Sequence, residues 1–258
     1  MDLRDTGGDG APVVFVHGLL VDGTIWDDVV ERLPHRRCIV LELPLGAHRA
    51  PAPDRSALTP AGVADLIAAE IERLDLRDVT VVGNDTGGAI CQLLVVRHPE
   101  RIAKLVLTPC DALEVFPPTI FKPLFAAGRH PALLHAFVQP LRIPAARRLP
   151  IAYGWLTKRA RDETLARWSA ALLRGGEPLA DASHFFRHVS PDVLLDAAPR
   201  LREFDGEVVV AWPPKDRIVP IAVGRRLAAQ FRAARFVEVE DSYSFVPLDR
   251  PDALAALI

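Results

Sequence analysis

The 258-residue sequence has few of the features that mark a metal protein, a secreted protein or a membrane protein. Its three cysteines, Cys38, Cys91 and Cys110, lie in or beside apolar runs without metal-ligand spacing, which predicts buried thiols in a reducing compartment. No apolar stretch is long enough to span a bilayer, and the first residues lack the hydrophobic region of a signal peptide. We therefore expect a cytoplasmic location.

An excess of charge of one sign is also missing. The formal net charge is −2, a quarter of the residues are charged, and acidic and basic residues are interspersed. This balance does not indicate a nucleic-acid or membrane-surface partner. Half of the residues are hydrophobic, and there is no internal repeat or low-complexity segment. The length suits one large α/β domain with room for an inserted cap.

The stretch from Val79 to Ala89 is the most informative part of the chain. A β-branched apolar run ends at Gly83, and a helical pattern begins near Gly87. Asp85 lies between them in the frame G-x-D-x-G, which is the spacing of a nucleophile elbow with Asp in place of Ser. Glycine relieves the crowding of such a sharp turn, and a helix N-terminus favours a carboxylate. We interpret Asp85 as a candidate nucleophile. The alternative is a surface Asp in an ordinary glycine-rich turn.

Apolar runs typical of buried strands alternate with helical patterns along most of the chain. Expected strands cover residues 12–16, 38–43, 79–82, 102–108, 207–212 and 235–239. Thr59 is expected to cap a helix whose first position is Pro60. The alternation predicts an α/β fold with a mostly parallel sheet and helices on both faces. Residues 112–200 show helical patterns without strands, which predicts a helical cap inserted into a core of residues 1–111 and 201–258.

Three features, in this order, resemble the α/β-hydrolase fold over nearly the whole chain. They are His17-Gly18 after an early strand, Asp85 in its G-x-D-x-G frame, and Asp216 in the loop 213–220. An Asp at the elbow resembles the branch that contains haloalkane dehalogenases and epoxide hydrolases. In that branch the Asp attacks carbon and forms an alkyl-enzyme ester, which a His-activated water then hydrolyses.

The resemblance implies a role for each matching residue. Asp85 takes the nucleophile position, and the backbone N–H groups of Leu19 and Thr86 take the oxyanion-hole positions. Asp216 matches the acid that orients the catalytic His, although it could instead cap the helix that follows it. Asp111 occupies an acid position used by some members, but no second motif supports it, so a structural role is favoured.

The sequence departs from both subfamilies. The loop after the last expected strand has Ser244 where the family has its catalytic His, and a hydroxyl cannot activate water near pH 7 as imidazole does. Haloalkane dehalogenases carry a Trp after the nucleophile, where this chain has Thr86. Epoxide hydrolases carry H-G-x-P and two cap tyrosines, where this chain has Leu20 and one cap tyrosine, Tyr153.

Three further residues are candidates for substrate binding. His17 belongs to the expected oxyanion loop, Tyr153 lies in the expected cap, and His184 is the first candidate to replace the missing base. His184 and His188 are four residues apart, but nothing completes a H-E-x-x-H motif. We therefore predict no metal and no cofactor.

The leading hypothesis is an enzyme that acts on a small, largely apolar molecule beneath an aromatic-rich cap. Asp85 either forms an alkyl-enzyme ester or acts as a general acid or base in a non-hydrolytic step such as elimination, isomerisation or cyclisation. A ligand-binding protein that has lost activity is the rival class, and an engineered Ser244 in an ordinary hydrolase is a third interpretation. Retention of Asp85 and Asp216 favours an enzyme. The sequence indicates no oligomeric state.

Overall fold

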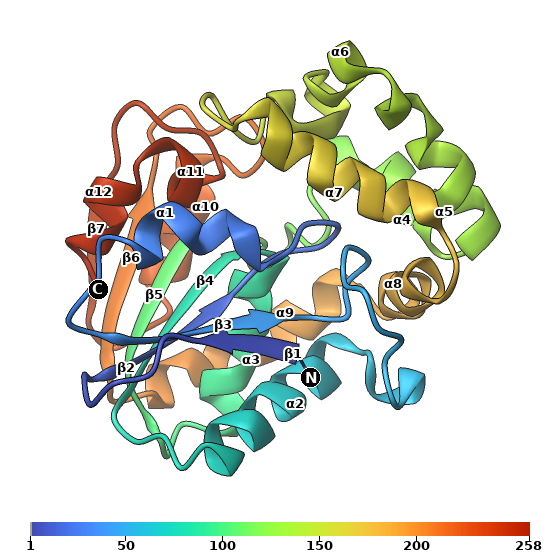
Figure 1. The fold of residues 1–258 in the computed structure, drawn as a ribbon. Coiled ribbons are helices and arrows are strands. Elements are labelled where there is room, and N and C mark those ends of the chain that lie inside the picture. The colour runs from blue at the N-terminus through green and yellow to red at the C-terminus, as the bar shows by residue number, and fades with distance from the viewer. Residues whose placement is uncertain (1) are drawn as a thin grey trace.

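The computed structural model describes residues 2–258. A seven-stranded sheet in the order β1-β3-β2-β4-β5-β6-β7 forms its centre (Figure 1). The strands are β1 (Asp2–Asp5), β2 (Pro12–Val16), β3 (Arg37–Glu42), β4 (Val79–Asp85), β5 (Ile102–Cys110), β6 (Glu207–Trp212) and β7 (Ala234–Glu238). Every neighbouring pair is parallel except β1 and β3. The predicted fold class is confirmed.

The β4 strand lies in the middle of the sheet, paired with β2 on one side and β5 on the other. Residues 79–84 are all buried, because helices cover both faces of the sheet and leave no side of the strand in water. Asp85 ends this strand. In an open parallel sheet the crevice for ligands lies beyond the carboxyl ends of the strands, so β4 places Asp85 there.

The edge strand β1 was not expected from the sequence. Asp2–Asp5 has three charged residues out of four and no apolar face. It forms because its backbone pairs with the free edge of β3, where Asp5 lies beside Ile39. Arg37 adds a bidentate ion pair to Asp5, with its Nη2 at 2.7 Å from Oδ2. Pairing across the sheet, and not local hydrophobicity, decides this element.

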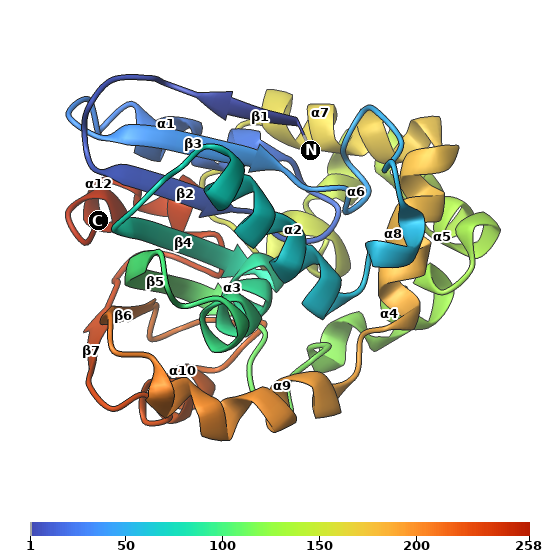
Figure 2. The same cartoon turned by 90° about the horizontal axis from the view of Figure 1, so that it is seen from below.

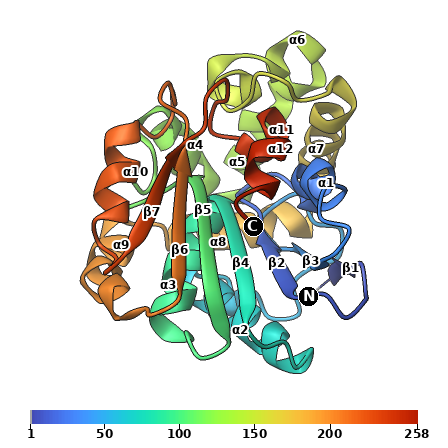
Figure 3. The same ribbon diagram turned by 90° about the vertical axis from the view of Figure 1, so that its left-hand side faces the viewer.

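Helices cover both faces of the sheet, as Figures 2 and 3 show. The core helices are α1 (Asp27–Val30), α2 (Pro60–Arg73), α3 (Thr86–Arg97), α9 (Pro191–Ala197), α10 (Ile221–Ala228), α11 (Val246–Asp249) and α12 (Pro251–Ala255). The pair α1 and α12 packs on one face, and α2, α3 and α9 pack together on the other. Thr59 caps α2 as expected, since its hydroxyl accepts the N–H of Gly62 at 2.9 Å.

Five helices between β5 and β6 lie over the carboxyl end of the sheet (Figure 1). They are α4 (Lys122–Gly128), α5 (Pro131–Val138), α6 (Pro144–Arg147), α7 (Asp162–Arg174) and α8 (Glu177–Arg187). The cap predicted for residues 112–200 is longer than this group of helices, because it also includes α9. The next helix, α9, packs against α3 and so covers the sheet, because its apolar residues Leu194 and Ala197 are buried there.

Buried carboxylates on both sides of the boundary join the cap to the core. Their hydrogen bonds run from Trp168 Nε1 to Asp22 (2.9 Å), from the Ala52 N–H to Asp181 (2.8 Å) and from Thr157 Oγ1 to Asp249 (2.7 Å). Each carboxylate receives several donors, so its charge is stabilised although it is buried. These contacts fix the height of the cap above Asp85.

Candidate active site

Asp85 is the last residue of β4, where the chain turns into α3. Its backbone has φ 55° and ψ −135°, a conformation that costs a non-glycine residue about 1–3 kcal/mol. The turn leaves no room for flanking side chains. A Cβ on Gly83 would lie 2.7 Å from the Cα of Gly88, and one on Gly87 would lie 2.5 Å from the carbonyl oxygen of His17. Packing therefore requires glycine at the positions that the G-x-D-x-G spacing indicated.

Two backbone N–H groups near the Asp85 carboxylate favour its charged form and so lower its pKa. They belong to Leu19, in the loop after β2, and to Thr86, the first residue of α3. Gly18 makes this approach possible, because a Cβ there would clash with the Asp85 side chain. These are the two amides for which the resemblance implied an oxyanion hole.

Asp216 and Ser244 lie in the loops that follow β6 and β7. The Ser244 hydroxyl donates to Asp216 Oδ1 at 3.0 Å. The same oxygen accepts the N–H groups of Ile218 and Val219, each at 2.7 Å, so Asp216 also caps the turn before α10. Its other oxygen, Oδ2, is buried and has no hydrogen-bond partner within residues 2–258. One carboxylate oxygen therefore caps this turn and also contacts residue 244, where the family has its catalytic His.

No motif in the sequence singles out Asn84, yet its side chain fixes the Ser244 loop. The fully buried Nδ2 donates to the carbonyl oxygen of Ser244 at 2.8 Å, to that of Pro109 at 3.2 Å and to the Thr108 hydroxyl at 2.8 Å. An amide in an otherwise apolar buried strand is the signal that could have identified it, because a buried polar group needs partners.

We expect Asn84→Asp to lower the free energy of unfolding by about 2–4 kcal/mol at pH 7. A carboxylate cannot donate to the carbonyl groups of Ser244 and Pro109, and it would bring a buried charge. Urea denaturation measures the change. Gln230→Glu is the matched control, since the Gln230 amide donates to the carbonyl of exposed Arg226, and we expect a change within about 0.5 kcal/mol. Equal losses in both variants would show that Asn84 does not hold the loop.

Asp111 lies in the same site as Asp85, at the acid position that the resemblance offered as an alternative, although a structural role was favoured for it. It is buried after the end of β5, and its Oδ2 accepts the Thr86 hydroxyl at 2.9 Å. Its Oδ1 lacks a hydrogen-bond partner in the described part of the chain. The signal available in the sequence was its position directly after a strand next to the elbow strand.

The site concentrates carboxyl groups, and each has a raised pKa. Burial raises the pKa of Asp85 to about 7, the nearby Asp216 charge adds to the rise, and the N–H groups of Thr86 and Leu19 oppose it. Burial also raises the pKa of Asp216 to about 6. Burial and then the Asp85 charge raise the pKa of Asp111 well above its usual range. Near neutral pH the cluster therefore retains protons.

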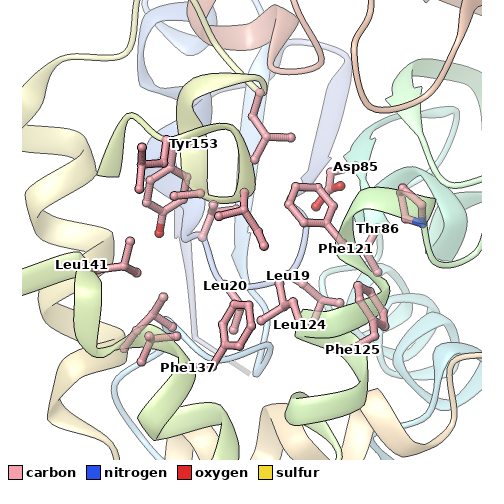
Figure 4. Close-up of a pocket in the computed structure, with 18 of the residues that line it drawn as sticks. Leu19, Leu20, Asp85, Thr86, Phe121, Leu124, Phe125, Phe137, Leu141 and Tyr153 are labelled. Atoms are coloured by element: carbon pink, nitrogen blue, oxygen red, sulfur yellow. The ribbon is translucent and has the colours of Figure 1, made fainter. Parts of the chain in front are cut away.

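An apolar cavity of about 440 Å³ separates Asp85 from the cap (Figure 4). Its only polar lining residues within the described chain are Asp85, Thr86, Asp111 and Tyr153, and Lys, Arg and His are absent from the lining. The apolar wall comes from the core loops after β2 and β7 and from the cap, and includes Leu19, Leu20, Phe121, Leu124, Phe125, Phe137, Leu141, Leu149, Ile151 and Phe245. Other cap aromatics, such as Trp168 and Phe185, are fully buried away from the lining.

Sequence comparison agrees with this architecture. The family model of the alpha/beta hydrolase fold matches residues 11–251. The chain belongs to this family. The matched range includes the elbow, both acid positions and the Ser244 loop.

Two curated relatives of this α/β-hydrolase-fold chain are hydrolases by name. It is 28% identical over 239 residues to a pimeloyl-[acyl-carrier protein] methyl ester esterase of Chromobacterium violaceum, with 87% of this chain and 83% of the relative covered. It is 24% identical over 267 residues to a 2-hydroxy-6-oxononadienedioate/2-hydroxy-6-oxononatrienedioate hydrolase of Escherichia coli, with 99% and 88% covered.

Solved structures share the fold of this family member. An ancestral haloalkane dehalogenase superimposes with a TM-score of 0.79 at 18% identity, covering 99% of this chain and 92% of that one. A thermophilic esterase from Thermogutta terrifontis superimposes with a TM-score of 0.77 at 20% identity, covering 99% and 90%. At these identities the likeness concerns the fold alone.

Two of the three predicted substrate-binding residues lie outside the cavity. His17 is fully buried beneath the loop after β2, where its Nε2 accepts the N–H of Leu43 at 3.0 Å and its Nδ1 lies 2.8 Å from the carbonyl oxygen of Gly18. His184 stacks on His188 with ring centroids 4.7 Å apart. Neither residue lines the cavity, so neither placement supports the predicted role in substrate binding. The four-residue spacing of His184 and His188 does not tell which face of α8 packs against the protein, so it could not predict that His184 points away from the cavity.

Tyr153 does line the cavity. It lies in the short helix η5 (Pro150–Gly154) of the cap and faces the pocket across from Asp85 (Figure 4). Its hydroxyl is buried with no hydrogen-bond partner of good geometry in residues 2–258, since the neighbouring Ser169 donates to the Leu165 carbonyl at 2.7 Å. Burial raises the pKa of this phenol, so it remains a hydrogen-bond donor.

Within residues 2–258 no group of three or more His, Cys, Asp or Glu side chains is arranged to hold a metal ion. The same residues include no helix with the length and apolar character needed to cross a bilayer.

Proposed function

We propose that this protein is a hydrolase of small neutral substrates in which Asp85 is the nucleophile and attacks an electrophilic carbon. The observation that carries the proposal is the position of the Asp85 carboxylate, which borders an apolar cavity beside the N–H groups of Leu19 and Thr86. A carboxylate has about four lone-pair sites, so it keeps one for attack even when both amides donate to it.

In the first step an Asp85 oxygen bonds to carbon, and the leaving group departs with the electron pair of the broken bond. An alkyl halide loses halide. In an epoxide one ring C–O bond breaks, and the oxygen stays on the other carbon and takes a proton from water. The product is an alkyl-enzyme ester. Only the ionised carboxylate attacks, so the raised pKa of Asp85, about 7, sets the pH range of this step.

In the second step water adds to the carbonyl carbon of the ester. The charge that develops on the carbonyl oxygen would be stabilised by the amides of Leu19 and Thr86. Release of the alcohol restores the carboxylate and frees one proton. Ser244 is not basic near pH 7, and Asp216 uses Oδ1 to bind it and does not line the cavity. We therefore expect this step to be slow and the ester to accumulate.

The lining of the cavity supports a neutral, largely apolar substrate. Among the described residues, the wall offers no cation to a substrate anion and is apolar apart from four residues. Tyr153 contributes to this wall, while its hydroxyl oxygen is buried.

The names of the relatives, an esterase and a hydrolase, favour hydrolysis over the alternatives. A second candidate is suggested by the raised pKa of Asp85, since a carboxyl group that titrates near pH 7 also suits general acid–base catalysis of an elimination or isomerisation. The two differ in one observable: only the nucleophilic route leaves a covalent bond on Asp85.

Incubation of the protein with alkyl halides and epoxides should give an adduct on Asp85 detectable by peptide mass spectrometry. We expect the rate of adduct formation to rise with pH and to reach half of its maximum near pH 7, because burial raises the pKa of Asp85 to about that value. The adduct should persist in the native chain.

Asp85→Asn is the matched control, since its amide has the same shape but is not nucleophilic. It should give no adduct at this position at any pH. If the native chain consumes or converts substrates while Asp85 stays unmodified, the general acid–base candidate replaces the nucleophilic one. If it binds them without conversion, the protein is a ligand-binding member of the family.

A further inference from the structure

One segment of the cap has a charge very different from that of the chain as a whole. Residues 115–161 contain eight Lys or Arg residues and no Asp or Glu, in a chain of net charge −2. The net charge of the whole chain does not reveal this basic segment. Some of its cations are paired with acids elsewhere, as Arg148 is with Asp162, but Arg142 and Arg147 form no ion pair with any described residue.

The same segment holds most of the exposed large hydrophobic side chains. Ile143, Leu149 and Ile151 are 60%, 50% and 42% exposed. They lie within eleven residues, 141–151, which include α6 and which we call the cap tip. The α6 helix lies at the end of the cap farthest from the sheet (Figure 1). Exposed aliphatic side chains beside unpaired arginines form an amphipathic, cationic tip.

Two residues of this tip belong both to the cavity wall and to the surface. Leu149 and Ile151 line the cavity and are 50% and 42% exposed. A molecule that entered between them would pass from the surface of the tip to Asp85 along apolar side chains.

We propose that the cap tip docks on a lipid surface that carries anionic headgroups, with the aliphatic side chains among the acyl chains and Arg142 and Arg147 at the headgroups. Charge complementarity favours this partner, because the tip brings cations and no acid. A projecting tip with aliphatic side chains suits a deformable lipid surface better than the aromatic-rich core of a protein interface. Apolar substrates dissolved in the lipid would then enter the cavity directly.

Sedimentation with vesicles tests the proposal. We expect the native chain to bind vesicles of phosphatidylcholine mixed with phosphatidylglycerol, to bind pure phosphatidylcholine much more weakly, and to lose binding as salt rises. Arg142→Glu combined with Ile143→Ser should reduce the partition coefficient by about tenfold or more, because it reverses one charge and removes one inserted side chain. Neither residue lines the cavity.

The control makes the same changes on another surface. Leu195→Ser with Arg202→Glu changes another exposed pair, on the core side, where Leu195 is 42% exposed, and should leave vesicle binding unchanged. Equal losses in both double variants would show non-specific attraction and overturn the proposal. Failure of the native chain to bind anionic vesicles would also overturn it, even if an acidic protein bound to the tip. Adduct formation on Asp85 in lipid-free solution is independent of these results.

Discussion

Ser244→His is expected to raise the rate of substrate hydrolysis by about 10²–10⁴-fold, the usual contribution of general-base catalysis. The position is suited to a base, because the Ser244 hydroxyl already bonds to Asp216 Oδ1 at 3.0 Å. An imidazole bonded to that carboxylate would be held in one tautomer and could take a proton from water. It would also bring a cation between Asp216 and Asp85 and so moderate the repulsion that raises the pKa of Asp85.

The measurement is steady-state turnover of those substrates that modify Asp85 in the native chain, with adduct decay followed in parallel. Decay of the ester should accelerate while its formation changes little, since only the second step needs the base. Ser244→Asn is the matched control, because its amide can bond to Asp216 but has no basicity near pH 7. It should accumulate the adduct as the native chain does.

Chemical rescue provides a second route if Ser244→His folds poorly. Ser244→Gly should gain turnover on addition of free imidazole, because the cavity of about 440 Å³ beside Asp85 is large enough to admit this small base. A well-folded Ser244→His that accelerates neither turnover nor adduct decay, together with no rescue, would show that the site is not built for hydrolysis.

Asp85→Asn is expected to stabilise the fold at alkaline pH. The pKa of Asp85 in the folded state, about 7, exceeds the ordinary aspartate value of 3.8, so the folded state holds its proton more tightly than the unfolded chain does. A raised carboxyl pKa contributes stability below the unfolded value, and this contribution is lost as pH rises to 7. At 1.36 kcal/mol per pKa unit, the variant should gain about 2–3 kcal/mol over the native chain between pH 5 and pH 8.

Urea denaturation of both proteins across this pH range checks the prediction. Asn retains an acceptor for the N–H groups of Leu19 and Thr86, so the comparison isolates the charge. Asp205→Asn on the surface is the control and should change stability by less than about 0.5 kcal/mol at every pH. A pH-independent difference between Asp85→Asn and the native chain would show that Asp85 is not desolvated.

Much of the site could be predicted from short segments of the sequence. The spacing of Gly83, Asp85 and Gly87 determined the elbow, because a sharp strand-to-helix turn excludes side chains at its flanks whatever surrounds it. The partner of Ser244 was also foreseeable. Strands of one parallel sheet end at the same edge, so loops after neighbouring strands meet, and Asp216 and Ser244 follow β6 and β7.

Other parts depended on contacts between distant segments. The β1 strand exists through pairing with β3, and Asn84 matters because its amide meets carbonyl groups from two other loops. The direction of His184 depends on which face of α8 the core buries.

The sequence by itself therefore determined the fold class, the elbow and the residues that could meet at the carboxyl edge of the sheet. Only the tertiary structure decided that Asp111 joins Asp85, that the histidines lie outside the cavity and that burial raises three carboxyl pKa values together. The physical reason is the distance along the chain over which each interaction acts. Backbone sterics and hydrophobic periodicity act over a few residues, whereas desolvation and hydrogen bonding depend on what the whole chain brings to one place.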